Sequence, residues 1–286
     1  MTIIVTGATG HLGHLIVDAL LRDGTPAADI VAAGRSTAKL EELAALGIRT
    51  ARIDFSEPDT LAAAFAGADT LMLVSASEPG QRFPQHKAAI DAAKAAGVSR
   101  IVYTSAPAAT TSALILAPEH KATEEYLVAS GIPFTILRNG WYTENYTGSA
   151  KQAIASGTLA SSAGAGTVSS ASRKDYADAA AAVLVDDSHA GQTYELSGDT
   201  AWDFAELAAA ITEVSGAPVA FAALTPEEHH AALIGAGLDE GTAGFVVALD
   251  GNIRDGLLGH TPGDLSRLIG RPTTPLREGL AAELVE

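Results

Sequence analysis

The sequence contains no cysteine among its 286 residues, and this absence excludes disulfides, thiolate metal sites and cysteine nucleophiles. Basic residues are also few: 18 Lys and Arg stand against 34 Asp and Glu, for a formal net charge of -16. Because a protein that grips nucleic acid needs a cationic face, we expect no nucleic-acid partner. No apolar run approaches the roughly 18 residues of a membrane span, and the start MTIIVTG does not have the pattern of a signal peptide. We therefore expect a cytoplasmic protein that does not associate with membranes.

What is present is a regular alternation of short β-branched segments with alanine- and leucine-rich segments of helical period. The predicted strands cover residues 2–6, 29–34, 48–54, 69–74, 100–105 and 133–138, and the predicted helices cover 11–22, 37–46, 58–66, 82–96 and 118–130. This alternation predicts an α/β fold, a Rossmann-type doubly wound parallel sheet with helices on both faces. A left-handed glycine is expected at the end of each helix, at Gly24, Gly47, Gly67, Gly97 and Gly131.

The alternation changes after residue 138. We expect a helix over 143–156, a glycine- and serine-rich loop over 156–172, a helix over 173–186 and a strand at about 193–198 that returns to the main sheet. Residues 202–286 are expected to be helical with turns, with no further βα cycle. The predicted domains are a Rossmann domain, 1–138 plus about 193–198, and a smaller, mainly helical substrate-side lobe, 139–192 and 199–286.

The first strand is followed by TGATGHLGH, in which Gly7, Gly10 and Gly13 are spaced three apart. In a strand-to-helix turn, Gly7 allows a positive φ and Gly10 allows the backbone to approach a pyrophosphate closely. Gly13 allows the helix to pack closely on the strand. The helix N-terminus adds free N–H groups and partial positive charge. A tight turn without a ligand is the alternative, and the surrounding strand–helix cycles favour a dinucleotide site.

The end of the second strand discriminates between dinucleotides, because NAD enzymes place an acidic residue there. Here Arg35 occupies that place and Lys39 follows one turn later. An arginine suits a 2'-phosphate, so NADP(H) is the predicted cofactor, although both cations could simply be solvated. Asp54 and Phe55 end the third strand, where Asp54 could contact an adenine amino group or cap the next helix.

The segments TGATGHLG, YTSA, LRNGWYTENY and LSRLIGRPTTPL together resemble the NmrA-like atypical short-chain dehydrogenase/reductases. Within that group the likeness is to NAD(P)H:quinone oxidoreductases of type 2 first and to triphenylmethane dye reductases second. The resemblance implies direct hydride transfer from NADPH to a quinone, without flavin or metal. It leaves two alternatives: another electron-poor acceptor such as a dye, and a non-catalytic NADP-sensing regulator. A homodimer is possible.

The resemblance also implies a set of site residues. The cofactor-binding residues are Gly7, Ala8, Thr9, Gly10, His11, Leu12, Gly13, Arg35, Asp54, Phe55, Ser75, Ala76, Ser77, Glu78, Thr104, Asn139, Gly140, Trp141, Tyr142, Thr143, Glu144 and Arg173. The substrate-binding residues are Trp141, Tyr142, Asn145 and Tyr146. For Arg173, an ion pair with Asp175 or Asp178 at a helix start is an equally good interpretation.

One departure from the wider superfamily bears on mechanism. Short-chain reductases use Tyr-x-x-x-Lys, but here Ala117 stands four residues before Lys121. A ketone needs an acid for the developing alkoxide, whereas a quinone accepts hydride to give a stable phenolate, so the missing tyrosine favours quinones or dyes. The catalytic candidates are His120, Lys121 and Tyr142, with Trp141 available to stack on a flat acceptor.

His229 and His230 are adjacent and do not converge as metal-binding histidines at i and i+4 do. We expect them on a solvated helix face.

Overall fold

The computed structural model describes residues 1–78 and 80–284. The chain divides into two compact units. The first contains Met1–Thr110, Leu116–Asn139 and Arg173–Glu195, and the second contains Thr111–Ile115, Gly140–Ser172 and Leu196–Glu286. Residues 173–192 thus belong to the first unit, and the division into a cofactor domain and a substrate-side lobe stays a prediction.

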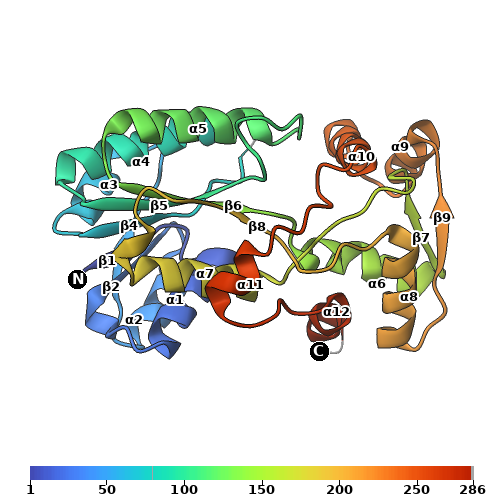
Figure 1. Ribbon diagram of the computed structural model, residues 1–286, viewed down its shortest axis with the longest axis horizontal. Coiled ribbons are helices and arrows are strands. Elements are labelled where there is room, and N and C mark those ends of the chain that lie inside the picture. Colours follow the sequence, from blue (N-terminus) through green and yellow to red (C-terminus); the bar gives the residue numbers. More distant parts are fainter. Residues whose placement is uncertain (79, 285–286) are drawn as a thin grey trace. The chain divides into compact units, whose positions relative to one another are not determined.

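A seven-stranded sheet in the order β3-β2-β1-β4-β5-β6-β8 forms the centre of the first unit (Figure 1). Its strands are β1 (Ile3–Val5), β2 (Ile30–Gly34), β3 (Arg49–Arg52), β4 (Thr70–Leu73), β5 (Arg100–Ser105), β6 (Phe134–Asn139) and β8 (Thr193–Leu196). The strands from β3 to β6 pair in parallel. The strand order reverses at β1, which pairs with β2 on one side and β4 on the other, and this switch point is where open α/β sheets bind ligands. The predicted fold class is confirmed.

Helices cover both faces of this sheet (Figure 1). One face carries α1 (His11–Arg22), α2 (Thr37–Ala44) and α7 (Arg173–Leu184), and the other carries α3 (Pro58–Phe65), α4 (Arg82–Ala96) and α5 (Ala117–Ser130). The short 3-10 turns η1 (Ala27–Asp29) and η3 (Asp187–His189) precede β2 and β8. The core cluster against α3, α4 and α5 includes the fully buried Phe65, Ile90 and Leu127. All five glycines predicted to follow helices have positive φ.

The second unit is mainly helical but includes a second sheet. It contains η2 (Thr143–Tyr146), α6 (Thr147–Ser156), β7 (Thr158–Ser161), α8 (Phe204–Ser215), β9 (Ala220–Ala223), α9 (Pro226–Gly235), α10 (Glu240–Arg254), α11 (Asp264–Ile269) and α12 (Leu276–Leu284). β7 and β9 pair in parallel as a two-stranded sheet. Two expectations were wrong: β7 lies in the expected loop, and β9 lies in the part expected to be helical. The sequences TLAS and AFAA have little β-propensity, so the pairing itself and the packing against α8 stabilise them.

Helix starts in this unit follow from local sequence. Asp203 and Glu206 form a capping box at the start of α8, and Thr225 and Glu228 form another at the start of α9. No helix among the described residues is both long and apolar enough to span a membrane.

Candidate active site

The turn after β1 brings backbone together where side chains have no room. Gly7 has a φ of +64°, and its carbonyl accepts the Gly10 N–H at 2.8 Å. A Cβ on Gly13 would lie 2.2 Å from the Gly7 carbonyl oxygen, so the first turn of α1 packs directly on this backbone. No side chain of the described residues caps α1. The free amides and partial positive charge of the helix start suit a pyrophosphate.

Two cations follow β2 next to this turn. Lys39 Nζ donates to the Thr9 carbonyl oxygen at 3.1 Å, which holds the ammonium against the turn. Gly34, the last residue of β2, touches Thr9 so closely that a Cβ would lie 2.6 Å from its Oγ1. Arg35 comes next, and its Nη1 lies 3.0 Å from Oε1 of Glu78. The structure therefore places both predicted cations at the edge of the glycine turn.

Asp54 follows β3 and bonds within its own loop. Its Oδ1 accepts from the Ser56 hydroxyl at 2.6 Å and from the Ser56 N–H at 2.9 Å. These two bonds lower the pKa of the Asp54 carboxyl, and the charge of Arg35 adds to the effect. The carboxylate thus orders the loop before α3, whose N-cap is Glu57 and not Asp54, while Phe55 lies edge-on to His86 with ring centroids 6.4 Å apart.

The segment 75–78 after β4 is fixed at its start by three hydrogen bonds. Ser75 N–H donates to Thr104 Oγ1 at 2.8 Å, so two predicted cofactor residues touch each other. Ala76 N–H donates to His86 Nε2 at 2.9 Å, and the Ala76 carbonyl accepts from Arg82 Nε at 2.8 Å. The segment is thereby anchored to α4 and β5.

His86 has a defined protonation state that the sequence did not reveal. Because Nε2 accepts the Ala76 amide, Nδ1 carries the hydrogen and donates to Thr123 Oγ1 at 3.0 Å. Burial lowers the pKa of His86 to about 3, and the charge of Arg82 acts in the same direction. His86 is therefore a neutral structural support for the segment 75–78.

His120 and Lys121 are neighbours in α5 but have opposite environments. His120 is buried, and its Nδ1 lies 2.7 Å from the Tyr103 hydroxyl. Burial is the main cause that lowers the pKa of His120 to about 3, and the positive charge of Arg82 acts in the same direction. Burial has the opposite effect on the Tyr103 hydroxyl and raises its pKa. Lys121 is exposed, with Nζ 4.0 Å from Oε1 of Glu125. Of these two predicted catalytic residues, His120 is therefore enclosed by protein and Lys121 faces solvent.

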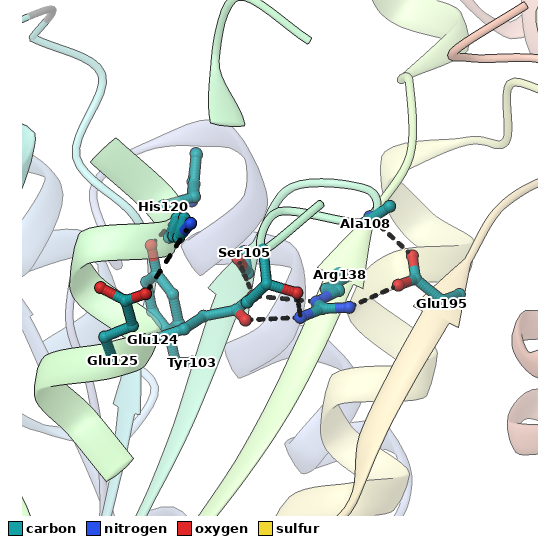
Figure 2. Close-up of polar contacts among 10 residues, drawn as sticks. Tyr103, Ser105, Ala108, His120, Glu124, Glu125, Arg138 and Glu195 are labelled. Atoms are coloured by element: carbon teal, nitrogen blue, oxygen red, sulfur yellow. Dashed lines mark hydrogen bonds and ion pairs between the residues drawn. The ribbon is translucent and has the colours of Figure 1, made fainter. Parts of the chain in front are cut away.

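A charged cluster around Arg138 lies near the carboxyl ends of β5 and β6 (Figure 2). Arg138 binds both oxygens of the buried Glu124, at 2.9 and 2.6 Å, and Oε1 of Glu195 at 2.8 Å. The hydrogen bonds with Glu124 are the main cause of the raised pKa of Arg138. Ser105 Oγ donates to Glu124 at 2.6 Å, and the Ala108 N–H donates to Glu195 at 3.0 Å.

The Arg138 cluster holds the loop after β5 in a strained shape. Among the described residues, Ala108 is the one non-glycine residue with a positive φ, +45°. The sequence does not reveal the cluster, because its members come from four separate elements and a loop and form no motif.

The stretch from Asn139 to Tyr146 is divided between the units. Asn139 ends β6 in the first unit, and Gly140 begins the second. Within the second unit, Thr143 N–H donates to the Ala171 carbonyl at 2.9 Å, and its hydroxyl lies 2.9 Å from that of Ser170. The predicted binding residues Gly140, Trp141, Tyr142, Thr143, Glu144, Asn145 and Tyr146 thus all belong to one unit.

Tyr146 is largely enclosed within the second unit. Its ring lies 5.0 Å from that of Trp202 and 6.0 Å from that of Phe204, between centroids. Burial raises the pKa of its hydroxyl. This packing gives Tyr146 a structural role whether or not it touches a substrate.

Arg173, a predicted cofactor-binding residue, begins α7 in the first unit.

The adjacent histidines His229 and His230 were expected on a solvated helix face. This expectation was wrong for His229, which is buried with Nδ1 3.0 Å from Oδ2 of Asp250. Its partner Asp250 sits on α10, far away in sequence, and so was invisible to a local helical pattern.

A family model described as NAD(P)H-binding matches residues 7–187. The chain belongs to this NAD(P)H-binding family. Quinone oxidoreductase 2 of Escherichia coli K12 is 46% identical over 279 residues, which are 98% of this chain and 97% of that protein. The predicted membership of the NmrA-like reductases, near quinone oxidoreductase type 2, is confirmed.

Solved structures agree over the whole length. The NADPH complex of an NADPH-dependent quinone oxidoreductase from Escherichia coli has a TM-score of 0.94 at 46% identity, covering 98% of this chain and 99% of that one. Triphenylmethane reductase of Citrobacter sp., complexed with NADP(H), has a TM-score of 0.94 at 37% identity, covering 99% of this chain and all of that one (100%). The glycine turn, which leads into the uncapped start of α1, fits the nucleotide that this family binds.

Proposed function

We propose that the chain is an NADPH-dependent quinone oxidoreductase. The observation that carries the proposal is the 46% identity to quinone oxidoreductase 2, which extends over 98% of this chain. When bound, the reduced nicotinamide supplies a hydride, and a quinone that accepts a hydride and one proton becomes a hydroquinone.

The first unit offers the groups that would bind this cofactor. The glycine turn and the start of α1 would hold the pyrophosphate, with Arg35 and Lys39 as cations for the 2'-phosphate. The segment 75–78, anchored by Thr104 and His86, would border the cofactor at the carboxyl ends of β4 and β5. Asn139 and the segment 140–145 are the proposed neighbours of the nicotinamide and the acceptor.

His120 would contribute a hydrogen bond and not a mobile proton. A phenol is a better donor than a neutral imidazole, so Tyr103 donates to Nδ1 and leaves the His120 hydrogen on Nε2. This neutral N–H can stabilise the oxygen that becomes a phenolate during reduction. Reduction of a quinone needs no stronger acid than this neutral N–H donor. The presence of Ala117 where other short-chain reductases have the catalytic tyrosine is consistent with such an acceptor.

A cationic dye is the second candidate acceptor. It is favoured by the 37% identity and the TM-score of 0.94 to triphenylmethane reductase. The net charge of -16 would also attract a cation.

The experiment that tests the function is NADPH oxidation, followed at the absorbance of reduced nicotinamide, with a panel of quinones, triphenylmethane dyes and ketones. We expect turnover with quinones at least about tenfold faster than with ketones, after subtraction of the rate without protein. Turnover of dyes alone would make the second candidate correct. Tight NADP binding without turnover of any acceptor would indicate a nucleotide sensor. A homodimer and a cytoplasmic location stay predictions.

A further inference from the structure

An ion pair crosses the sheet at the glycine turn. Arg35 directly follows β2, and Glu78 lies in the segment after β4. Because β1 lies between β2 and β4 in the sheet, the contact between Arg35 Nη1 and Glu78 Oε1 at 3.0 Å passes over the carboxyl end of β1. The turn that begins at Gly7 starts at this end.

The two partners are held unequally. Glu78 uses both oxygens, since Oε2 accepts from Gln85 Nε2 at 2.9 Å, and this bond ties the carboxylate to α4. Among the described residues, Glu78 is the single hydrogen-bond partner of the Arg35 guanidinium, which is 69% exposed. Arg35 can therefore turn away from Glu78 while the carboxylate stays in place.

We propose that Glu78 is a specificity-determining residue that competes with the 2'-phosphate of NADPH for Arg35. The inference rests on the proposed role of Arg35 as the phosphate ligand. A phosphate that binds Arg35 competes with Glu78 for the same positive charge and lies near a carboxylate of like charge. NADH has no 2'-phosphate and gains little from Arg35. Glu78 thus reduces the preference for NADPH and speeds the release of NADP⁺, which carries the same 2'-phosphate, after hydride transfer.

The size of the effect follows from the exposure of the pair. An exposed ion pair changes an equilibrium by up to about fivefold, and removal of a nearby like charge adds a similar factor at low salt. We expect Glu78→Gln to lower the Kd for NADPH by about threefold to tenfold and to change the Kd for NADH by less than about twofold. The gain should shrink as salt rises, because both contributions are between exposed charges.

The experiment is a fluorescence titration of the full-length protein with NADPH and with NADH, at low and at near-physiological salt. Glu57→Gln is the matched control, because Glu57 also pairs with an exposed arginine, Arg52, at 3.2 Å and makes no helix-cap bond. It removes the same charge from the same edge of the sheet and should change the Kd for NADPH by less than about twofold. Melting temperatures verify that both variants are folded.

Arg35→Ala separates the two hypotheses. If this variant keeps the wild-type ratio of the Kd values for NADPH and NADH, Arg35 is not the phosphate ligand and the proposed assignment fails. If Arg35→Ala weakens NADPH selectively, the assignment holds and Glu78→Gln decides the competition. Weaker NADPH binding in Glu78→Gln would mean that Glu78 orients Arg35, and an effect equal to that of Glu57→Gln would mean that only net charge matters. Either result overturns the proposal.

Discussion

Burial decides which chemistry His120 can perform. Its pKa of about 3 keeps the imidazole neutral throughout the physiological range, and the hydrogen bond with Tyr103 occupies Nδ1. An imidazolium that gives its proton to an alkoxide is therefore not available at this position. What remains is a fixed neutral donor, which suits an acceptor whose reduced oxygen is a weak base.

This environment predicts the pH dependence of turnover. With a quinone as acceptor, kcat should vary by less than about twofold between about pH 5.5 and 8, since His120 does not titrate there. His120→Gln should lower kcat by less than about tenfold and leave the profile flat. The measurement is a pH profile of kcat at saturating NADPH, with Tyr103→Phe as the control that removes only the partner hydroxyl. An inflection near pH 6.5 in the wild type that disappears in His120→Gln would contradict the neutral role.

At the scale of elements, the contact between the glycine turn and α1 defines two different requirements. At Gly13 the obstacle is the protein's own backbone, because an added Cβ would lie 2.2 Å from the Gly7 carbonyl oxygen. At Gly10 the nearest atom is 3.3 Å away, so a methyl group fits with a small adjustment. Gly13 is therefore required by the packing of α1, whereas Gly10 leaves room for a ligand.

The two alanine variants should therefore separate stability from binding. Gly13→Ala should lower the free energy of unfolding by about 2 to 3 kcal/mol, because backbone atoms must move apart. Gly10→Ala should cost less than about 1 kcal/mol but raise the Kd for NADPH about tenfold or more, since its methyl group would meet the pyrophosphate. Urea unfolding and NADPH titration of both variants test the contrast. Equal losses of stability would refute the distinction.

Elements differ in how far the sequence predicts them. The strands β1, β2, β4 and β5 and the glycines that follow helices were predictable, because buried parallel strands and left-handed helix ends have strong local signals. β7 and β9 were not, because four-residue segments such as AFAA become strands only through pairing with a distant partner. The Arg138 cluster escaped for the same reason: Arg138, Glu124 and Glu195 are polar residues without a shared motif.

At the scale of the whole molecule, two neutral histidines link folding to pH. His86 and His120 have pKa values of about 3 in the folded chain, against about 6.5 for an exposed histidine. The unfolded chain therefore binds more protons than the folded one between about pH 3 and 6.5. Stability must fall as the pH falls through this window, and it is unaffected by these groups above it.

The expected loss at pH 5 is roughly 2 kcal/mol for each of the two histidines, relative to pH 7. Carboxylates with lowered pKa values, such as Asp54, lose their contribution only below their unfolded pKa near 3.8, so the range from about pH 5 to 7 isolates the histidines. Urea unfolding at several pH values measures the slope, and His86→Gln should remove about half of it while retaining an acceptor for the Ala76 amide. His230→Gln is the matched control, because His230 is partly exposed and pairs with the exposed Glu240. A slope that His86→Gln leaves unchanged would show that another group couples folding to protons, and that His86 is charged or hydrated in the folded chain.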